Sequence, residues 1–145
     1  MILSSQLLLS DDQAITATAL STNQIDLGVA GTPFDAIAPL NRDIGKGYPV
    51  PVLIQVTEDF NNLTSLTVTI ETDDDSAFGS PSVLITETIA LADLVAGKYT
   101  NTIVLPTGID ERYLAVRYTV VGTAPSTGRI TASITGGVQT NVTGP

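Results

Sequence analysis

The chain has 145 residues and a formal net charge of −9, with 6 Lys and Arg residues against 15 Asp and Glu residues. It contains no Cys, His or Trp, which excludes disulfides, Cys or His zinc sites, thiol nucleophiles and Ser-His-Asp triads. The acidic balance also argues against nucleic acid and anionic membranes as partners, because both are bound through clustered Lys and Arg.

The first predicted element is an N-terminal arm, residues 1–12, which carries the run Leu7, Leu8 and Leu9. Adjacent leucines on an arm need an apolar partner, either this domain's own sheet or a neighbouring molecule. We favour the neighbour, so these leucines are candidate contact residues. The arm lacks the basic flank of a signal peptide, and no run in the chain approaches the roughly 20 apolar residues that span a bilayer.

Alternation of apolar and polar residues predicts an all-β domain, because period two is the pattern of a half-buried strand. The regular strands are predicted at 15–19, 52–56, 65–71, 114–120 and 130–135, and less regular ones at 25–27, 83–89 and 99–105. Turn residues separate these segments, and residues 90–96 predict a short helical connector that Gly97 ends. The pattern predicts a jelly-roll β-sandwich of about eight short antiparallel strands with extended termini and one long loop.

Residues 28–51 form the longest stretch without a strand pattern, and they are rich in Gly and Pro. Loops longer than about 12–15 residues are uncommon in compact domains unless they are functional or disordered. The segment is therefore predicted to be an interaction loop, with an excursion that has no partner as the alternative. Its candidate contact residues are Arg42, Asp43, Lys46 and Tyr48, and Arg112, just before a regular strand, is a further candidate.

The domain division that follows is an arm at 1–12, a jelly-roll domain at 13–135 and a C-terminal tail at 136–145. Within it, the acidic run at 73–75 lacks the spacing of a calcium loop, and Asp-rich turns commonly bond their own backbone. Other carboxylates could form a glycosidase pair, but the chain has no Trp to supply a sugar platform. We expect no catalytic residue, no metal and no cofactor.

Several strings occur in a familiar order along nearly the whole chain. They are LLLSDDQA at 7–14, STNQIDLG at 21–28, RDIGKG at 42–47, ETDDDSAF at 71–78, PTGIDERYL at 106–114 and YTVVG at 118–122. Together they resemble the capsid cement (decoration) proteins of tailed phages, the family typified by the Bordetella phage cement protein.

The resemblance implies a jelly-roll domain without catalytic residues, made in the host cytoplasm and located on the outer capsid surface of the virion. Its implied partners are the phage major capsid protein and further copies of itself, as a dimer or a trimer, with no nucleic acid and no membrane. The main alternative is a carbohydrate-binding jelly-roll module of a virion. A glycosidase and another virion part, such as a tail subunit, are further alternatives.

Overall fold

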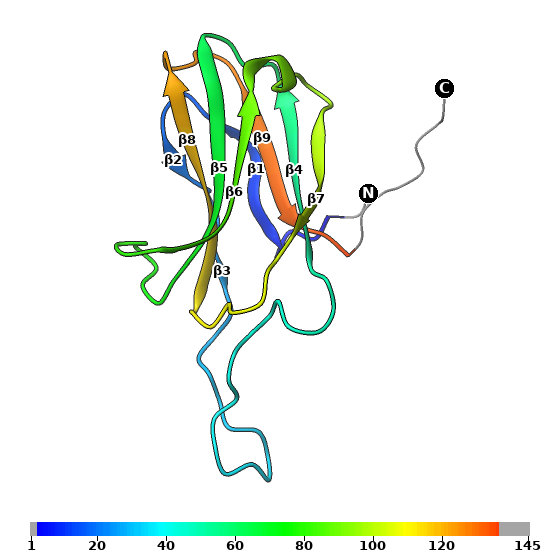
Figure 1. Cartoon of the computed structure of the whole chain (residues 1–145), viewed down its shortest axis with the longest axis vertical. Helices are drawn as coiled ribbons and strands as arrows, with labels where there is room; N and C mark the ends of the chain where they lie inside the picture. The colour runs from blue at the N-terminus through cyan, green and yellow to red at the C-terminus, as the bar shows by residue number, and fades with distance from the viewer. Residues whose placement is uncertain (1–2, 137–145) are drawn as a thin grey trace, which may run out of the picture.

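The alternating segments build two antiparallel sheets that pack face to face, as the computed structural model shows for residues 3–136 (Figure 1). The strands are β1 (Leu8–Ala14), β2 (Ala19–Leu20), β3 (Ile25–Asp26), β4 (Pro51–Glu58), β5 (Leu63–Asp73), β6 (Ser82–Ala90), β7 (Tyr99–Val104), β8 (Tyr113–Gly122) and β9 (Arg129–Ile134). A single turn of 3₁₀ helix, η1 (Leu91–Asp93), lies between β6 and β7.

The strand order confirms the predicted jelly-roll sandwich. One sheet has the order β1-β9-β4-β7, and the other has the order β2-β8-β5-β6 with β3 also paired to β8. Because β2 and β3 both pair with β8, they share one edge position, so the strands occupy eight positions. Apart from the hairpin of β5 and β6, which lies within one sheet, the chain crosses to the other sheet between successive positions, as in a jelly roll.

The core lies between the sheets and is formed by the apolar positions of the alternating pattern. In β5, Leu66, Val68 and Ile70 are at most 1% exposed, while the intervening threonines lie on the outer face. The inner residues of β4, β8 and β9 complete the same cluster. Burying each large apolar side chain contributes about 1.5–3 kcal/mol, which makes this cluster the main source of stability.

The N-terminal segment differs from its prediction. Residues 8–14 form β1, which pairs with β9, and Leu9 is fully buried in the chain's own core. The predicted arm at 1–12 is therefore wrong from Leu8 onward, because the main chain pairs with β9 and Leu9 enters the core. Most of the predicted tail at 136–145 lies outside the described residues.

The strand predicted at 15–19 is also wrong. Ile15 is fully buried, but only Ala19 of this segment belongs to a strand, namely β2. Here the chain passes from the sheet of β1 to the sheet of β2. Ile15 is buried because this connection crosses the core, and its burial gave the segment the same alternating pattern as a strand. The helical connector predicted at 90–96 is shorter, since only η1 is helical and Gly97 follows it at a φ of 90°.

A buried hydrogen-bond chain ties β1 to the second sheet. The Tyr118 hydroxyl lies 2.8 Å from Ser10 Oγ, and Ser10 donates to Gln13 Oε1 at 2.7 Å. Gln13 in turn donates to the carbonyl oxygen of Leu20 at 2.9 Å. Because Ser10 gives its one proton to Gln13, the Tyr118 hydroxyl is the donor to Ser10. Burial raises the pKa of Tyr118 far above its ordinary value.

We expect Ser10→Ala to lower the free energy of unfolding by about 1–3 kcal/mol, because it leaves the buried Tyr118 hydroxyl without a partner. Tyr118→Phe should cost about 1 kcal/mol, since Ser10 keeps its bond to Gln13. In the double variant the loss should be smaller than the sum, as equilibrium urea unfolding would show. Strictly additive losses would contradict the coupling.

Candidate functional site

The long loop between β3 and β4, residues 27–50, is the candidate functional site. It extends from one end of the sandwich, well beyond the strands (Figure 1). The projecting part is closed on itself, because the Leu40 amide donates to the Gly31 carbonyl at 2.8 Å and the Ala36 amide to the Pro33 carbonyl at 3.1 Å. We call residues 29–40 the loop tip.

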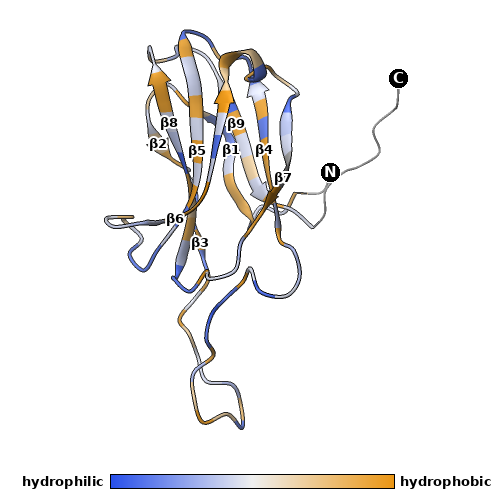
Figure 2. Cartoon of the chain, viewed as in Figure 1, coloured by the Kyte–Doolittle hydropathy of each residue, from blue (hydrophilic) through white to orange (hydrophobic). Residues whose placement is uncertain are grey.

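Large apolar side chains gather on the loop tip. Phe34 and Ile37 are fully exposed, and Val29 and Leu40 are 79% and 63% exposed; Figure 2 shows hydrophobic positions recurring along this projection. A single exposed apolar residue needs no explanation, but a group of them on one protrusion marks an interaction surface. Asp35 is the only charged residue at 29–40, so the tip is suited to an apolar contact.

The loop base is held against the segment that precedes β8. Arg42 donates to the carbonyl oxygen of Gly28, and Asp43 Oδ1 accepts from the Gly108 amide at 3.0 Å. Gly45 lies so close to this segment that a Cβ built there would be 1.6 Å from the Pro106 carbonyl oxygen. These contacts fix where the loop leaves the sandwich and thereby aim the tip.

A two-pronged ion pair forms the other side of the loop base. Arg112 Nε donates to Asp26 Oδ1 at 2.8 Å and Arg112 Nη2 to Asp26 Oδ2 at 2.7 Å, while the Gly28 amide also donates to Asp26 Oδ1. The Arg112 hydrogen bonds lower the pKa of Asp26 to about 2. Arg112 also lies 4.9 Å from the centre of the Tyr113 ring, so the Asp26 carboxylate and this ring together define the position of its guanidinium group.

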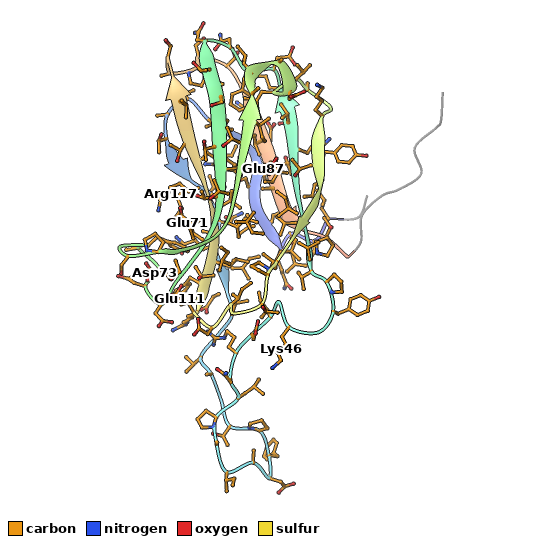
Figure 3. All side chains as sticks on the ribbon, viewed as in Figure 1. Lys46, Glu71, Asp73, Glu87, Glu111 and Arg117 are labelled. Atoms are coloured by element: carbon orange, nitrogen blue, oxygen red, sulfur yellow. The ribbon has the colours of Figure 1, made fainter. Side chains whose placement is uncertain are left out.

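The structure brings together some of the residues that the sequence singled out and separates others. Arg42, Asp43 and Arg112 meet at the loop base, where each bonds within the chain. Lys46 and Tyr48 lie on the same loop and are exposed (Figure 3). The first three residues therefore position the loop, and the last two remain available on its surface.

Leu7, Leu8 and Leu9 lie away from the loop, in or next to β1. The Leu7 carbonyl oxygen accepts from the Ile134 amide, Leu8 pairs with Ser133, and Leu9 belongs to the core. Their proposed contact with a neighbouring molecule is wrong for Leu9, whose side chain is buried in the chain's own core. For Leu7 and Leu8, whose side chains are half-buried, the contact stays a prediction.

The loop-tip residues were missed by the residue-level prediction, which selected charged residues and a tyrosine. The sequence does carry a signal for Phe34 and Ile37, because these apolar residues lie between Pro33 and Pro39 and do not alternate as in a strand. Proline locks its own φ and lacks an amide donor, so such a segment does not join a sheet. Its apolar side chains are then left for another surface.

The acidic run at 73–75 has the structural role that its composition favours. Asp73 accepts from the amides of Asp75 and Ser80, and Asp75 accepts from the Ala77 amide. The same backbone bonds lower the pKa of Asp73. Among residues 3–136 no group of three or more acidic side chains has the geometry of a metal site, and no helix in that range could cross a membrane.

A second ion pair lies on the outer face of the sheet that contains β5 and β8. Arg117 Nε donates to both oxygens of Glu71, at 3.0 and 2.9 Å, and Thr69 donates to Glu71 Oε1 (Figure 3). Glu71 is only 3% exposed, so Arg117 compensates a carboxylate that the sheet has desolvated. This pair is satisfied within the chain and leaves no free charge for catalysis.

Comparison with known proteins gives one match. The model of the family Bbp16 matches residues 9–134, which extend from within β1 to the last residue of β9 and include the whole loop. No curated protein matches the chain. The matched range thus covers both sheets and the candidate site.

We expect Gly45→Ala to open the loop base, because its methyl group would overlap the Pro106 main chain. Overpacking of this kind typically costs about 1–3 kcal/mol, and the NMR signals of Gly108 and Arg112 should shift. Gly31→Ala is the matched control, since nothing lies within 4 Å of a Cβ at that position. Equal unfolding free energies for the two variants would contradict the close contact.

The Asp26–Arg112 pair should be lost only in strong acid. Because the pKa of Asp26 falls from 3.8 to about 2 on folding, its stabilising effect is complete above pH 3.8 and disappears as the pH falls through about 2. We expect the carboxyl carbon of Asp26 to titrate near pH 2 by NMR, and at a higher pH in Arg112→Gln, where only the Gly28 amide still donates to it. A midpoint near 3.8 in the unaltered protein would argue against the pair.

Proposed function

The chain belongs to the Bbp16 family, the Bordetella phage cement proteins, and from this premise we propose that it binds the outer surface of a phage head and bridges neighbouring major capsid protein subunits. The observation that carries the proposal is the match over residues 9–134. The family is a structural one of phage capsids, so the role rests on contacts rather than on catalytic residues.

Bridging suits a protein of this shape. A phage head resists the pressure of packed DNA, and a clamp across a subunit boundary raises the cost of separating the subunits. A standard interface buries about 800 Å² per partner. When one bound molecule makes several contacts, each further contact forms at a high effective concentration, so individually modest patches hold tightly.

The loop supplies a contact element that is already organised. Its base is pinned through Asp26, Arg42 and Asp43, so little chain entropy remains to be lost when the tip binds. The exposed Phe34 and Ile37 resemble the apolar anchors that dominate binding energy at interfaces. We therefore assign the contacts between virion subunits to this loop rather than to the N-terminal segment.

The charge of the chain bears on how these contacts respond to salt. The net charge of −9 would suit basic patches on a capsid, and such a contact weakens as salt screens it. The loop tip carries only Asp35, so a contact through the tip should depend little on ionic strength. Salt titration of binding to heads therefore separates an apolar contact from an electrostatic one.

Particle reconstruction tests the function directly. We expect ordered density for the protein on the outside of purified heads, lying across the boundaries between capsid subunits. Density confined to the tail, or no binding to heads at all, would overturn the proposal.

The loop's part is tested by Phe34→Ser combined with Ile37→Ser. Both side chains are fully exposed, so folding should be unchanged while occupancy on heads at limiting protein falls about tenfold or more. Val121→Ser, on the outer face of β8, is the control for losing an exposed apolar side chain. Occupancy equal to that of the control would remove the tip from the contact.

A further inference from the structure

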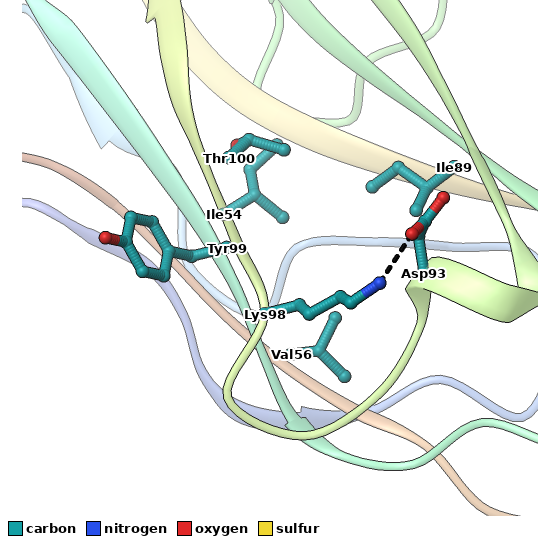
Figure 4. Close-up of a pocket in the computed structure, with 7 residues that line it drawn as sticks. All are labelled: Ile54, Val56, Ile89, Asp93, Lys98, Tyr99 and Thr100. Carbon is teal, nitrogen blue, oxygen red and sulfur yellow. Dashed lines mark hydrogen bonds and ion pairs between the residues drawn. The ribbon is translucent and has the colours of Figure 1, made fainter. Parts of the chain in front are cut away.

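An apolar cleft opens where the two sheets diverge, between β4 and β7 on one side and β6 and η1 on the other (Figure 4). Ile54, Val56 and Ile89 line it, and Lys98 crosses it to pair with Asp93 at 2.6 Å. Its volume is about 200 Å³. The cleft has no part in the loop site described above, since it is built from other strands.

We propose that the loop tip of one copy of the protein docks into this cleft on a second copy. The two features lie at opposite ends of the molecule, because η1 is at the end of the sandwich away from the loop (Figure 1). A tip whose base is pinned at one end cannot fold back over the length of its own sandwich. A tip that occupies the cleft must therefore come from another copy of the chain.

The sizes of the two surfaces agree. A dry protein cavity of about 150 Å³ is known to admit benzene, so a cleft of about 200 Å³ has room for one Phe or Ile side chain. The tip offers Phe34 and Ile37 in the fully exposed state. Moving either side chain from water into the cleft removes apolar surface on both partners, which is the general driving force of association.

The charged groups at the cleft do not oppose entry of the tip. Lys98 is 53% exposed and bonds Asp93, which is 62% exposed, so the two side chains neutralise each other. Asp35, the tip's only charge, therefore meets no net charge of its own sign at the cleft.

A contact of this type joins two different surfaces, so it is heterologous. Heterologous contacts close into rings when the rotation between copies permits, and otherwise they continue as open chains. On a capsid either outcome would link cement molecules to one another as well as to the shell. This inference rests on the proposed function and deepens it, because it names a second copy of the protein as the partner of the same loop tip.

A contact through one or two side chains buries far less than a standard interface, so we expect it to be weak in solution. On a shell, where neighbouring copies are held close, the same contact gains effective concentration. The test must therefore trap a weak association, and it should be made both with the free protein and with protein bound to heads.

The absence of Cys from the chain makes thiol cross-linking specific. Ala36→Cys marks the tip and Val95→Cys marks the turn beside the cleft, and the two singly substituted proteins are mixed with a short bismaleimide. Val121→Cys replaces Val95→Cys in the control mixture, since both valines are 42% exposed. We expect the mixed Ala36→Cys and Val95→Cys dimer to exceed the control product about tenfold.

Adding Phe34→Ser and Ile37→Ser to the tip-labelled protein should reduce the mixed dimer to the level of the control. Equal yields with Val95→Cys and Val121→Cys, or dimers formed mainly between two Ala36→Cys chains, would overturn the proposal. So would tip-labelled protein on heads that links only to the capsid protein. In each of these cases, if the protein still binds to heads, the proposed capsid function stands and only the tip-to-cleft contact is overturned.

Discussion

The pairing of β5 with β8 is the interaction on which the rest of the structure depends. The two strands are matched from Leu63 opposite Gly122 to Asp73 opposite Tyr113, and their inner faces carry much of the core. The short strands β2 and β3 exist only as partners of β8. Arg112 immediately precedes β8 and holds Asp26 at the end of β3, so the central ladder also determines where the long loop begins.

This dependence explains how the sandwich acquires a defined contact surface. The sandwich supplies a stiff body, the pinned base directs the loop, and the tip presents apolar side chains to a partner. At the other end, the 3₁₀ turn and the start of β7 leave an apolar cleft open between the sheets. In the proposed contact between copies, the loop tip at one end of a molecule and the cleft at the other would join neighbours head to tail.

Much of the fold could be predicted because its central strands are half buried. The segments at 65–71 and 114–120 alternate cleanly, since one face meets the core and the other meets water. The prediction failed at 15–19, where the apolar residues belong to a connection between the sheets. It also failed at Leu8 and Leu9, which belong to an edge strand whose pattern is interrupted by two consecutive aspartates. At the candidate site, the loop was predictable from its Gly and Pro content, but the exposure of Phe34 and Ile37 was not.

The sequence by itself determined the central strands, the position of the long loop and the exclusion of Cys and His chemistry, because these depend on residue type and local spacing. Tertiary structure alone decided that Leu9 faces the core, that Asp26 meets Arg112 across 86 positions, and that tip and cleft lie at opposite ends. Those outcomes depend on contacts between residues far apart in the chain. Such contacts arise only when the two sheets close on a common core.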